Sequence, residues 1–180
     1  MLSGFQFGCL SIIPIGISLI SNKTAPTPII TAQVEFEKRP EIDRWILSLL
    51  NTLVAEVTKQ LEDHEPTKAA RAISEFVGDN LSNWYVRLNR KRFWGGEMNE
   101  DKLSAYQTLY TCLETISLLI APISPFYADQ LYRDLTAVTK GKAESVHLAL
   151  YPVADEKVIN KALEAQMKVA QDITSMVLSL

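Results

Sequence analysis

The sequence predicts an all-α protein: a bundle of about four helices followed by a trailing C-terminal helix. From residue 41 onward, apolar side chains recur with the 3.6-residue period of an amphipathic helix. Pro66, Pro122, Pro125 and Pro152 stand between the periodic segments, as expected for residues that interrupt helices. A chain of 180 residues, 47% hydrophobic and 22% charged, is long enough for a sizeable core and too apolar for a disordered protein.

The first helix is expected to begin at Glu41, directly after Pro40, because a helix start tolerates proline and the helix dipole favours acids there. Its buried stripe is predicted to be Ile42, Ile46, Leu49, Leu53 and Val57, broadened by Trp45, Leu50, Val54 and Leu61. The second helix is expected to begin near Pro66 and to end before Gly95 and Gly96. Its predicted inward residues are Ile73, Val77, Leu81, Trp84 and Leu88.

Three cap residues predict the remaining helices. Asn99 is a suitable N-cap for a third helix, Ser124 for a shorter fourth helix after the break at Pro122, and Asp155 for the last helix. The inward residues expected in these helices are Leu103, Tyr106, Tyr110, Leu113, Ile116 and Ile120, then Phe126, Tyr127, Leu131 and Leu135, then Ile159, Leu163, Met167, Ala170, Ile173 and Val177. Between the last two helices we expect a polar loop over 138–144 and a short extended segment over 146–150.

The first 34 residues differ in character from the rest of the chain. Lys23 is their only charged residue, and glycine and proline interrupt their apolar runs. A secretory signal peptide would need basic residues before the apolar stretch, and a transmembrane helix about twenty uninterrupted apolar residues. The Gly8-Cys9 pair also fits a lipoprotein signal poorly. We therefore expect an atypical leader over residues 1–34, disordered or artefactual, and no membrane attachment.

Composition and motifs argue against several classes of function. Two distant cysteines, Cys9 and Cys112, argue against a disulfide scaffold or a cysteine-rich zinc site, and His64 and His147 are too scattered for a catalytic or metal-binding cluster. None of the seven glycines belongs to a GxGxxG or GxxxxGKS/T loop. We expect no catalytic residue, metal or cofactor in this chain. The net charge of −3 argues against nucleic-acid binding through a bulk positive field.

Several charged or reactive residues fit ordinary structural roles. Asp43 and Arg44 are expected to serve helix capping and surface pairing, and Asp129 and Arg133, four residues apart, to form a surface pair. Cys112 is expected to be a small core residue.

One stretch, residues 82–94, combines cations with aromatic rings. It contains four cations, no acid and four aromatic residues: Arg87, Arg90, Lys91, Arg92, Trp84, Tyr85, Phe93 and Trp94. RNA phosphates require cations, and the unstacked bases of a single-stranded loop require flat rings or guanidinium planes. A solvated basic helix end is the alternative, because cations there favour the helix dipole. Trp84 and Tyr85 lie on the apolar stripe and are expected to pack in the core.

Four segments, in order along residues 35–180, resemble the anticodon-binding domain of class I aminoacyl-tRNA synthetases of the isoleucine, valine and leucine group. They are RPEIDRWILS (39–48), FVGDNLSNWYVR (76–87) continuing to RFW (92–94), APISPF (121–126), and SVHL (145–148) with YP (151–152). The second segment is most similar to the isoleucine enzymes.

The resemblance implies a helical domain that binds the anticodon stem-loop of a tRNA. The similarity of the second segment to the isoleucine enzymes implies that this tRNA is the isoleucine tRNA. The RNA-contacting set that it implies is Arg87, Arg90, Lys91, Arg92 and Trp94, with Trp84, Tyr85 and Asn83 as supporting residues. A valine or leucine enzyme is the alternative within the group, and a helical protein–protein interaction domain without RNA binding is the alternative outside it. The resemblance also implies a cytoplasmic location and no DNA partner.

The sequence departs from the family in what it lacks. The ATP-binding signatures HIGH and KMSKS and the editing insertion are absent, so ATP and Mg²⁺ are expected to belong to a missing catalytic domain of the parent enzyme. We expect this fragment alone to be inactive, with the bundle over 35–153 and the start of a truncated C-terminal helical region over 154–180. Where the family has an aromatic Leu-Tyr-Asn-Thr-Tyr pattern, residues 12–15 read Ile-Ile-Pro-Ile. Codons shifted by one base would restore Tyr-Asn-Thr-Tyr, so we hypothesise a frame-shifted leader, which the gene sequence would test.

Overall fold

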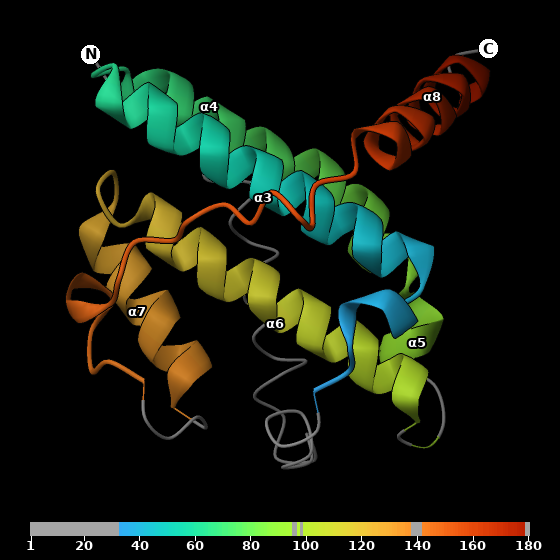
Figure 1. Ribbon diagram of the computed structural model, residues 1–180, viewed down its shortest axis with the longest axis horizontal. Coiled ribbons are helices and arrows are strands. Elements are labelled where there is room, and N and C mark those ends of the chain that lie inside the picture. The colour runs from blue at the N-terminus through green and yellow to red at the C-terminus, as the bar shows by residue number, and fades with distance from the viewer. Residues whose placement is uncertain (1–32, 95–96, 98, 138–141, 179–180) are drawn as a thin grey trace.

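The computed structural model describes residues 33–94, 97, 99–137 and 142–178 (Figure 1). The expectations for residues 1–32 and for the loop at 138–141 lie outside these residues. The helices are α3 (Glu41–Glu62), α4 (Pro66–Glu75), the π-helix η3 (Phe76–Val86), α5 (Arg90–Trp94), α6 (Glu100–Ile120), α7 (Pro125–Thr136) and α8 (Lys161–Leu178), with 3₁₀ turns η2 (Phe36–Lys38) and η4 (Val146–Leu148). The described residues contain no strand, and the predicted all-α class is confirmed.

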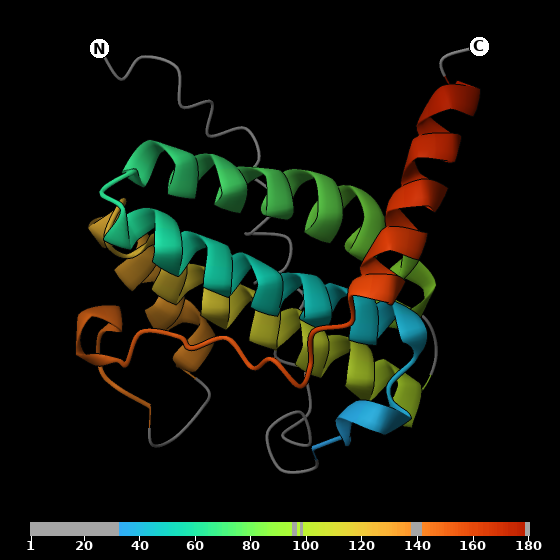
Figure 2. The same ribbon diagram turned by 45° about the horizontal axis from the view of Figure 1, so that its top comes forward.

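The bundle is built from α3, α6, α7 and a helical rod formed by α4, η3 and α5, which runs beside α3 (Figure 2). Its core contains Trp45, Ile46, Tyr85, Phe93, Leu109, Leu113, Ile116 and Leu135, all almost completely buried. α3 and α4 begin at the predicted residues, Glu41 and Pro66. α6 begins after Asn99, whose side chain accepts a 2.8 Å hydrogen bond from the amide of Lys102, so the predicted N-cap is confirmed.

The rod departs from the register predicted for it. One series of its buried residues recurs every four positions: Ile73, Val77, Leu81, Tyr85, Asn89 and Phe93. In a regular α-helix each four-residue step overshoots a full turn by about 40°, so such a series would wind off the core. The π-helix η3, with its wider turns, absorbs the excess. The prediction that Leu88 points inward is therefore wrong, since Leu88 is 55% exposed.

The start of α7 and the segment that follows this helix also differ from expectation. Ser124 occupies the N-cap position, but its side chain makes no capping hydrogen bond. Phe126 is exposed rather than buried, because it lies nine residues, or about two and a half turns, before the core residue Leu135. Beyond α7, the Ser145 hydroxyl and the Val146 amide donate hydrogen bonds of 2.6 and 3.1 Å to Asp129 of that helix. These bonds accompany the turn η4 where an extended segment was expected.

The last helix, α8, begins at Lys161, later than predicted. Asp155 instead heads a turn, accepting from the amide of Lys157, while Asn160 caps the helix by accepting from Leu163. α8 projects away from the bundle and has no fully buried residue (Figures 1 and 2). No helix in the described part of the chain is both long and apolar enough to cross a membrane.

The segment before α3 belongs to the bundle as well. Val34 falls within the leader expected over residues 1–34, yet it is buried, and its amide donates a 3.0 Å hydrogen bond to the Gln107 side chain on α6. Arg39 donates to the Val34 carbonyl and to the Thr108 hydroxyl of α6, which attaches this segment to α6 at a second point. The bundle therefore begins slightly before the predicted boundary at residue 35.

Candidate nucleic-acid interface

Three cations at the junction of η3 and α5 lack partners in the described structure. Arg87, Arg90 and Lys91 are exposed, and none forms an ion pair or a side-chain hydrogen bond with another described residue. Elsewhere among the described residues, ion pairs occupy Lys38, Arg44, Lys68, Arg92, Arg133, Lys142, Lys161 and Lys168. Lys59, Arg71 and Lys157 also form no ion pair with a described residue, but each lies on a different segment of the chain. The charges of Arg87, Arg90 and Lys91 are therefore available to an external anion.

An aromatic ring lies beside these cations. Trp94 is 57% exposed, while its neighbour Phe93 is 2% exposed. Phe93 packs edge-to-face against Tyr106 of α6, with ring centroids 5.4 Å apart, and against Trp94, with centroids 6.2 Å apart. Phe93 thus anchors α5 in the core and leaves the indole of Trp94 accessible for stacking.

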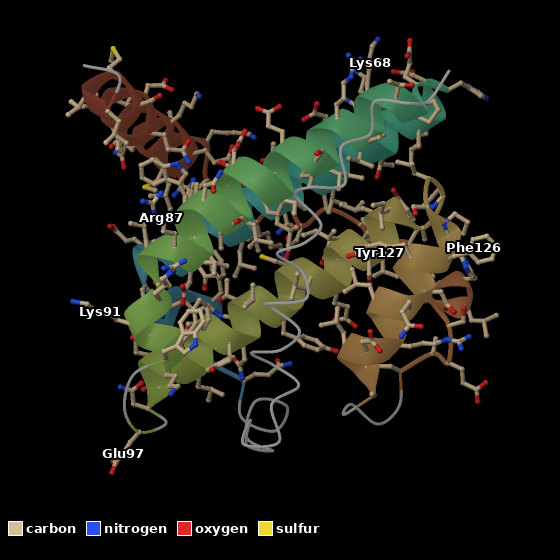
Figure 3. The ribbon with its side chains drawn as sticks, turned by 180° about the vertical axis from the view of Figure 1, so that it is seen from behind. Lys68, Arg87, Lys91, Glu97, Phe126 and Tyr127 are labelled. Atoms are coloured by element: carbon tan, nitrogen blue, oxygen red, sulfur yellow. The ribbon has the colours of Figure 1, made fainter. Side chains whose placement is uncertain are left out.

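We call Arg87, Arg90, Lys91 and Trp94 the basic edge. Figure 3 shows Arg87 and Lys91 along the same outer edge of the molecule, with Lys68 at the opposite end of the rod and Phe126 across the bundle. α8 contacts the rod before this edge, because Gln171 donates a 3.2 Å hydrogen bond to Asn80 of η3. Asn83 is exposed on η3, whereas Trp84 is half-buried and Tyr85 fully buried, as the apolar stripe predicted.

Arg92, the fourth predicted cation, is engaged inside the protein. Its guanidinium has five N–H donors and makes five hydrogen bonds of 2.8–2.9 Å. The acceptors are both carboxylate oxygens of Asp43, the side chain of Asn89, and the side chain and backbone carbonyl of Asp101. No donor of Arg92 is left for a phosphate, so we do not place it in the basic edge.

Asp43 is the centre of this network and was missed by sequence reasoning. It is 0% exposed and also accepts hydrogen bonds from Tyr85 at 2.9 Å and from Ser104 at 2.6 Å. Its position in the first turn of α3 gives it the same appearance in the sequence as the exposed Glu41. The one signal available in the sequence was the four-residue spacing of Tyr85, Asn89 and Phe93. It indicates a continuous buried face of the rod that includes polar side chains, and buried polar side chains need polar partners such as Asp43.

The electrostatics of the network keep its hydrogen bonds in place. Burial, followed by the charge of Asp43, raises the pKa of Tyr85 well above its ordinary value, so the phenol stays protonated and donates. Burial opposes the charge on Arg92, but the hydrogen bonds to Asp43 and Asp101 outweigh it and raise the pKa of Arg92. Removing one partner of a buried pair costs about 3–5 kcal/mol, compared with about 0–1 kcal/mol for an exposed pair.

Three further observations concern metal ligands, the buried thiol and a surface ion pair. No group of three or more His, Cys, Asp or Glu side chains among them is placed to hold a metal ion. Burial raises the pKa of the Cys112 thiol, so it remains protonated and unreactive in the core, as predicted for a small core residue. Asp129 and Arg133 form the expected surface pair at 2.9 Å.

Comparison with known proteins assigns the chain to a family. Residues 43–180 match the family described as the anticodon-binding domain of tRNA ligase. The isoleucine–tRNA ligase of Bacteroides thetaiotaomicron is 66% identical over 150 residues, which are 83% of this chain and 13% of that protein. The corresponding ligase of Porphyromonas gingivalis is 68% identical over 147 residues (82% and 13%), and that of Thermus thermophilus 47% over 133 residues (73% and 13%). The chain thus spans about 13% of the length of these relatives, and it belongs to the anticodon-binding domain family of the tRNA ligases.

Proposed function

We propose that this domain recognises the anticodon stem-loop of an isoleucine tRNA and that the basic edge is the surface that contacts the RNA. Binding of a tRNA follows from the family. The isoleucine identity is supported by the relatives, which are named as isoleucine–tRNA ligases. In a whole ligase the domain would position the tRNA, while attachment of isoleucine with ATP would take place in a catalytic domain outside this sequence.

The observation that carries the proposal is the group of three cations without described partners next to an exposed indole. Arg87, Arg90 and Lys91 can neutralise neighbouring phosphates, which releases counterions and makes binding depend on salt. Trp94 can stack with a base that the loop leaves unstacked. The alternative, a solvated basic helix end, would account for the exposed cations but not for an exposed tryptophan beside them.

Filter binding with an isoleucine tRNA transcript, repeated over a range of salt concentrations, tests the proposal. We expect Arg90→Ala and Lys91→Ala each to weaken binding and to reduce the slope of log affinity against log salt by about 0.7 to 1. Lys68→Ala is the matched control, because Lys68 is an exposed lysine at the far end of the same rod and is paired with Glu65 at 3.2 Å.

Equal weakening by the Lys68 control would show that only overall charge matters. Unchanged affinity in both edge variants would place the RNA elsewhere on the domain. A wild-type affinity that does not fall with salt would instead favour a helical protein-interaction domain.

A further inference from the structure

We propose that Asp43 and Arg92 form a positioning pair, which holds α5 in the orientation that presents the basic edge to RNA. The inference rests on the proposed function. It gives Arg92 a role that is different from RNA contact, and it assigns to Asp43, which is fully buried, an effect on RNA binding.

α5 needs an external constraint. It contains five residues, and a helix this short has little stability of its own. The hydrogen-bond spacing changes at Asn89, between the π-helical turns of η3 and the α-helical turns of α5: its amide donates to the Tyr85 carbonyl at 3.1 Å, and its carbonyl accepts from both Arg92 at 2.9 Å and Phe93 at 3.1 Å. Arg90, Lys91 and Trp94 all lie beyond this junction, and their positions relative to Arg87 depend on how α5 is held.

The network around Arg92 supplies that constraint from three directions. The two carboxylate oxygens of Asp43 hold the guanidinium from α3 at 2.8 and 2.9 Å. Asp101 holds it from the first turn of α6. The side chain of Asn89 accepts from Arg92 and donates to the Tyr85 carbonyl, which ties α5 back to the end of η3.

The planar geometry of the guanidinium explains why arginine is needed. Bidentate pairing with Asp43 fixes both the distance and the plane of the side chain, whereas a lysine ammonium would keep the charge without this geometry. Because all five donors are used, substituting Arg92 removes no donor that RNA could have used.

A double-mutant cycle with Arg92→Lys, Asp43→Asn and the combination tests the proposal on the full chain. Affinity for the isoleucine tRNA is measured across a salt series, and iodide quenching of Trp94 fluorescence is measured without RNA in a background where Trp45 and Trp84 are Phe. We expect each single variant to lose about tenfold in affinity, the double variant to lose no more than either single one, and the salt slope to stay unchanged. Trp94 quenching should change in all three variants.

Leu135→Ala is the matched control for general destabilisation, because Leu135 is a core residue of α7, at the opposite end of the bundle from α5 (Figure 1). It should lower the unfolding temperature and leave tRNA affinity and Trp94 quenching unchanged while the protein is folded. If a pair variant does not fold, Tyr85→Phe replaces it. That change removes the hydroxyl that donates to Asp43 at 2.9 Å and lies 3.4 Å from the Ala105 carbonyl, and a smaller loss of the same kind is expected.

Three results would overturn the positioning role. The first is weaker tRNA binding by Arg92→Lys with unchanged Trp94 quenching, which would make Arg92 a direct contact of the RNA. The second is an equal loss of affinity in Leu135→Ala, and the third is an additive double variant. If the wild-type chain fails to bind tRNA, the proposed function fails, and unaltered Trp94 quenching in the variants would then separately refute the positioning pair.

Discussion

Trp94 shows how a single side chain can be tested for a role in RNA binding. Stacking of a base on an aromatic ring contributes about 1–3 kcal/mol, and it involves no charge. We therefore expect Trp94→Ala to weaken tRNA binding by about that amount without changing the salt slope, in contrast to Lys91→Ala. Phe126→Ala is the control, because Phe126 is 91% exposed but lies far from the basic edge. Filter binding over a salt series measures both quantities, and an equal effect of the two aromatic substitutions would contradict a stacking role.

Lys91 and Arg92 show how much of the candidate site could be predicted for single residues from the sequence. Both are cations in the same motif, and the sequence predicted the same role for both. They differ because adjacent helical residues point about 100° apart, so Lys91 faces outward while Arg92 faces Asp43 and Asp101. Which of two neighbouring cations is exposed depends on the register of the helix, and that register was set by tertiary packing.

At the scale of elements, the attachment of α8 depends on one carboxylate. Glu164 accepts hydrogen bonds from Ser48 at 2.6 Å and Thr52 at 2.9 Å on α3, and from Lys161 at 3.0 Å. Burial alone would raise the pKa of Glu164, but these hydrogen bonds outweigh it and lower the pKa below the ordinary value of 4.5. The stabilisation is therefore complete above the pKa of an unfolded glutamate and is lost as the pH falls through the lower pKa of the folded state.

We predict that Glu164→Gln loosens α8 at neutral pH, because the amide lacks the charge that the three donors stabilise. Hydrogen exchange by mass spectrometry, corrected for intrinsic rates, should be faster in α8 and unchanged in α6. In the wild type, α8 exchange should approach that of the variant only at acidic pH. Asp172→Asn is the control, because its pair with Lys168 is exposed and solvent screening leaves such a pair little effect on stability. Identical protection of α8 in Glu164→Gln and wild type would show that apolar packing alone holds the helix.

The helices could be predicted where local signals and tertiary packing agree. α3 and α6 combine a regular apolar period with suitable starting residues, Glu41 and Asn99, and their starts were predicted correctly. The register of η3 could not be predicted in this way, because a π-helix changes the period that the prediction assumes. The start of α8 was misplaced because Asp155 and Asn160 are both good caps, and the contact between Ser48 and the Asn160 amide favours the later one.

At the scale of the whole molecule, the distribution of charge matters more than its sum. The chain has 18 basic and 21 acidic residues, so its overall field does not attract polyanions. Many of the remaining cations are neutralised by nearby acids, whereas those of the basic edge have no described partner. Attraction to RNA should therefore be local and should require a ligand that fits the edge.

This distribution predicts selectivity among polyanions. An oligonucleotide of the anticodon stem-loop should displace labelled tRNA at concentrations similar to those of intact tRNA. Duplex DNA with the same number of phosphates should need at least about tenfold more, because its stacked bases cannot reach Trp94 and lose the stacking energy. Competition filter binding measures this ratio, and Trp94→Ala should reduce it while Lys68→Ala should not. Equal competition by duplex DNA would mean that the domain responds to phosphate charge alone, and the role of the exposed indole would then have to be abandoned.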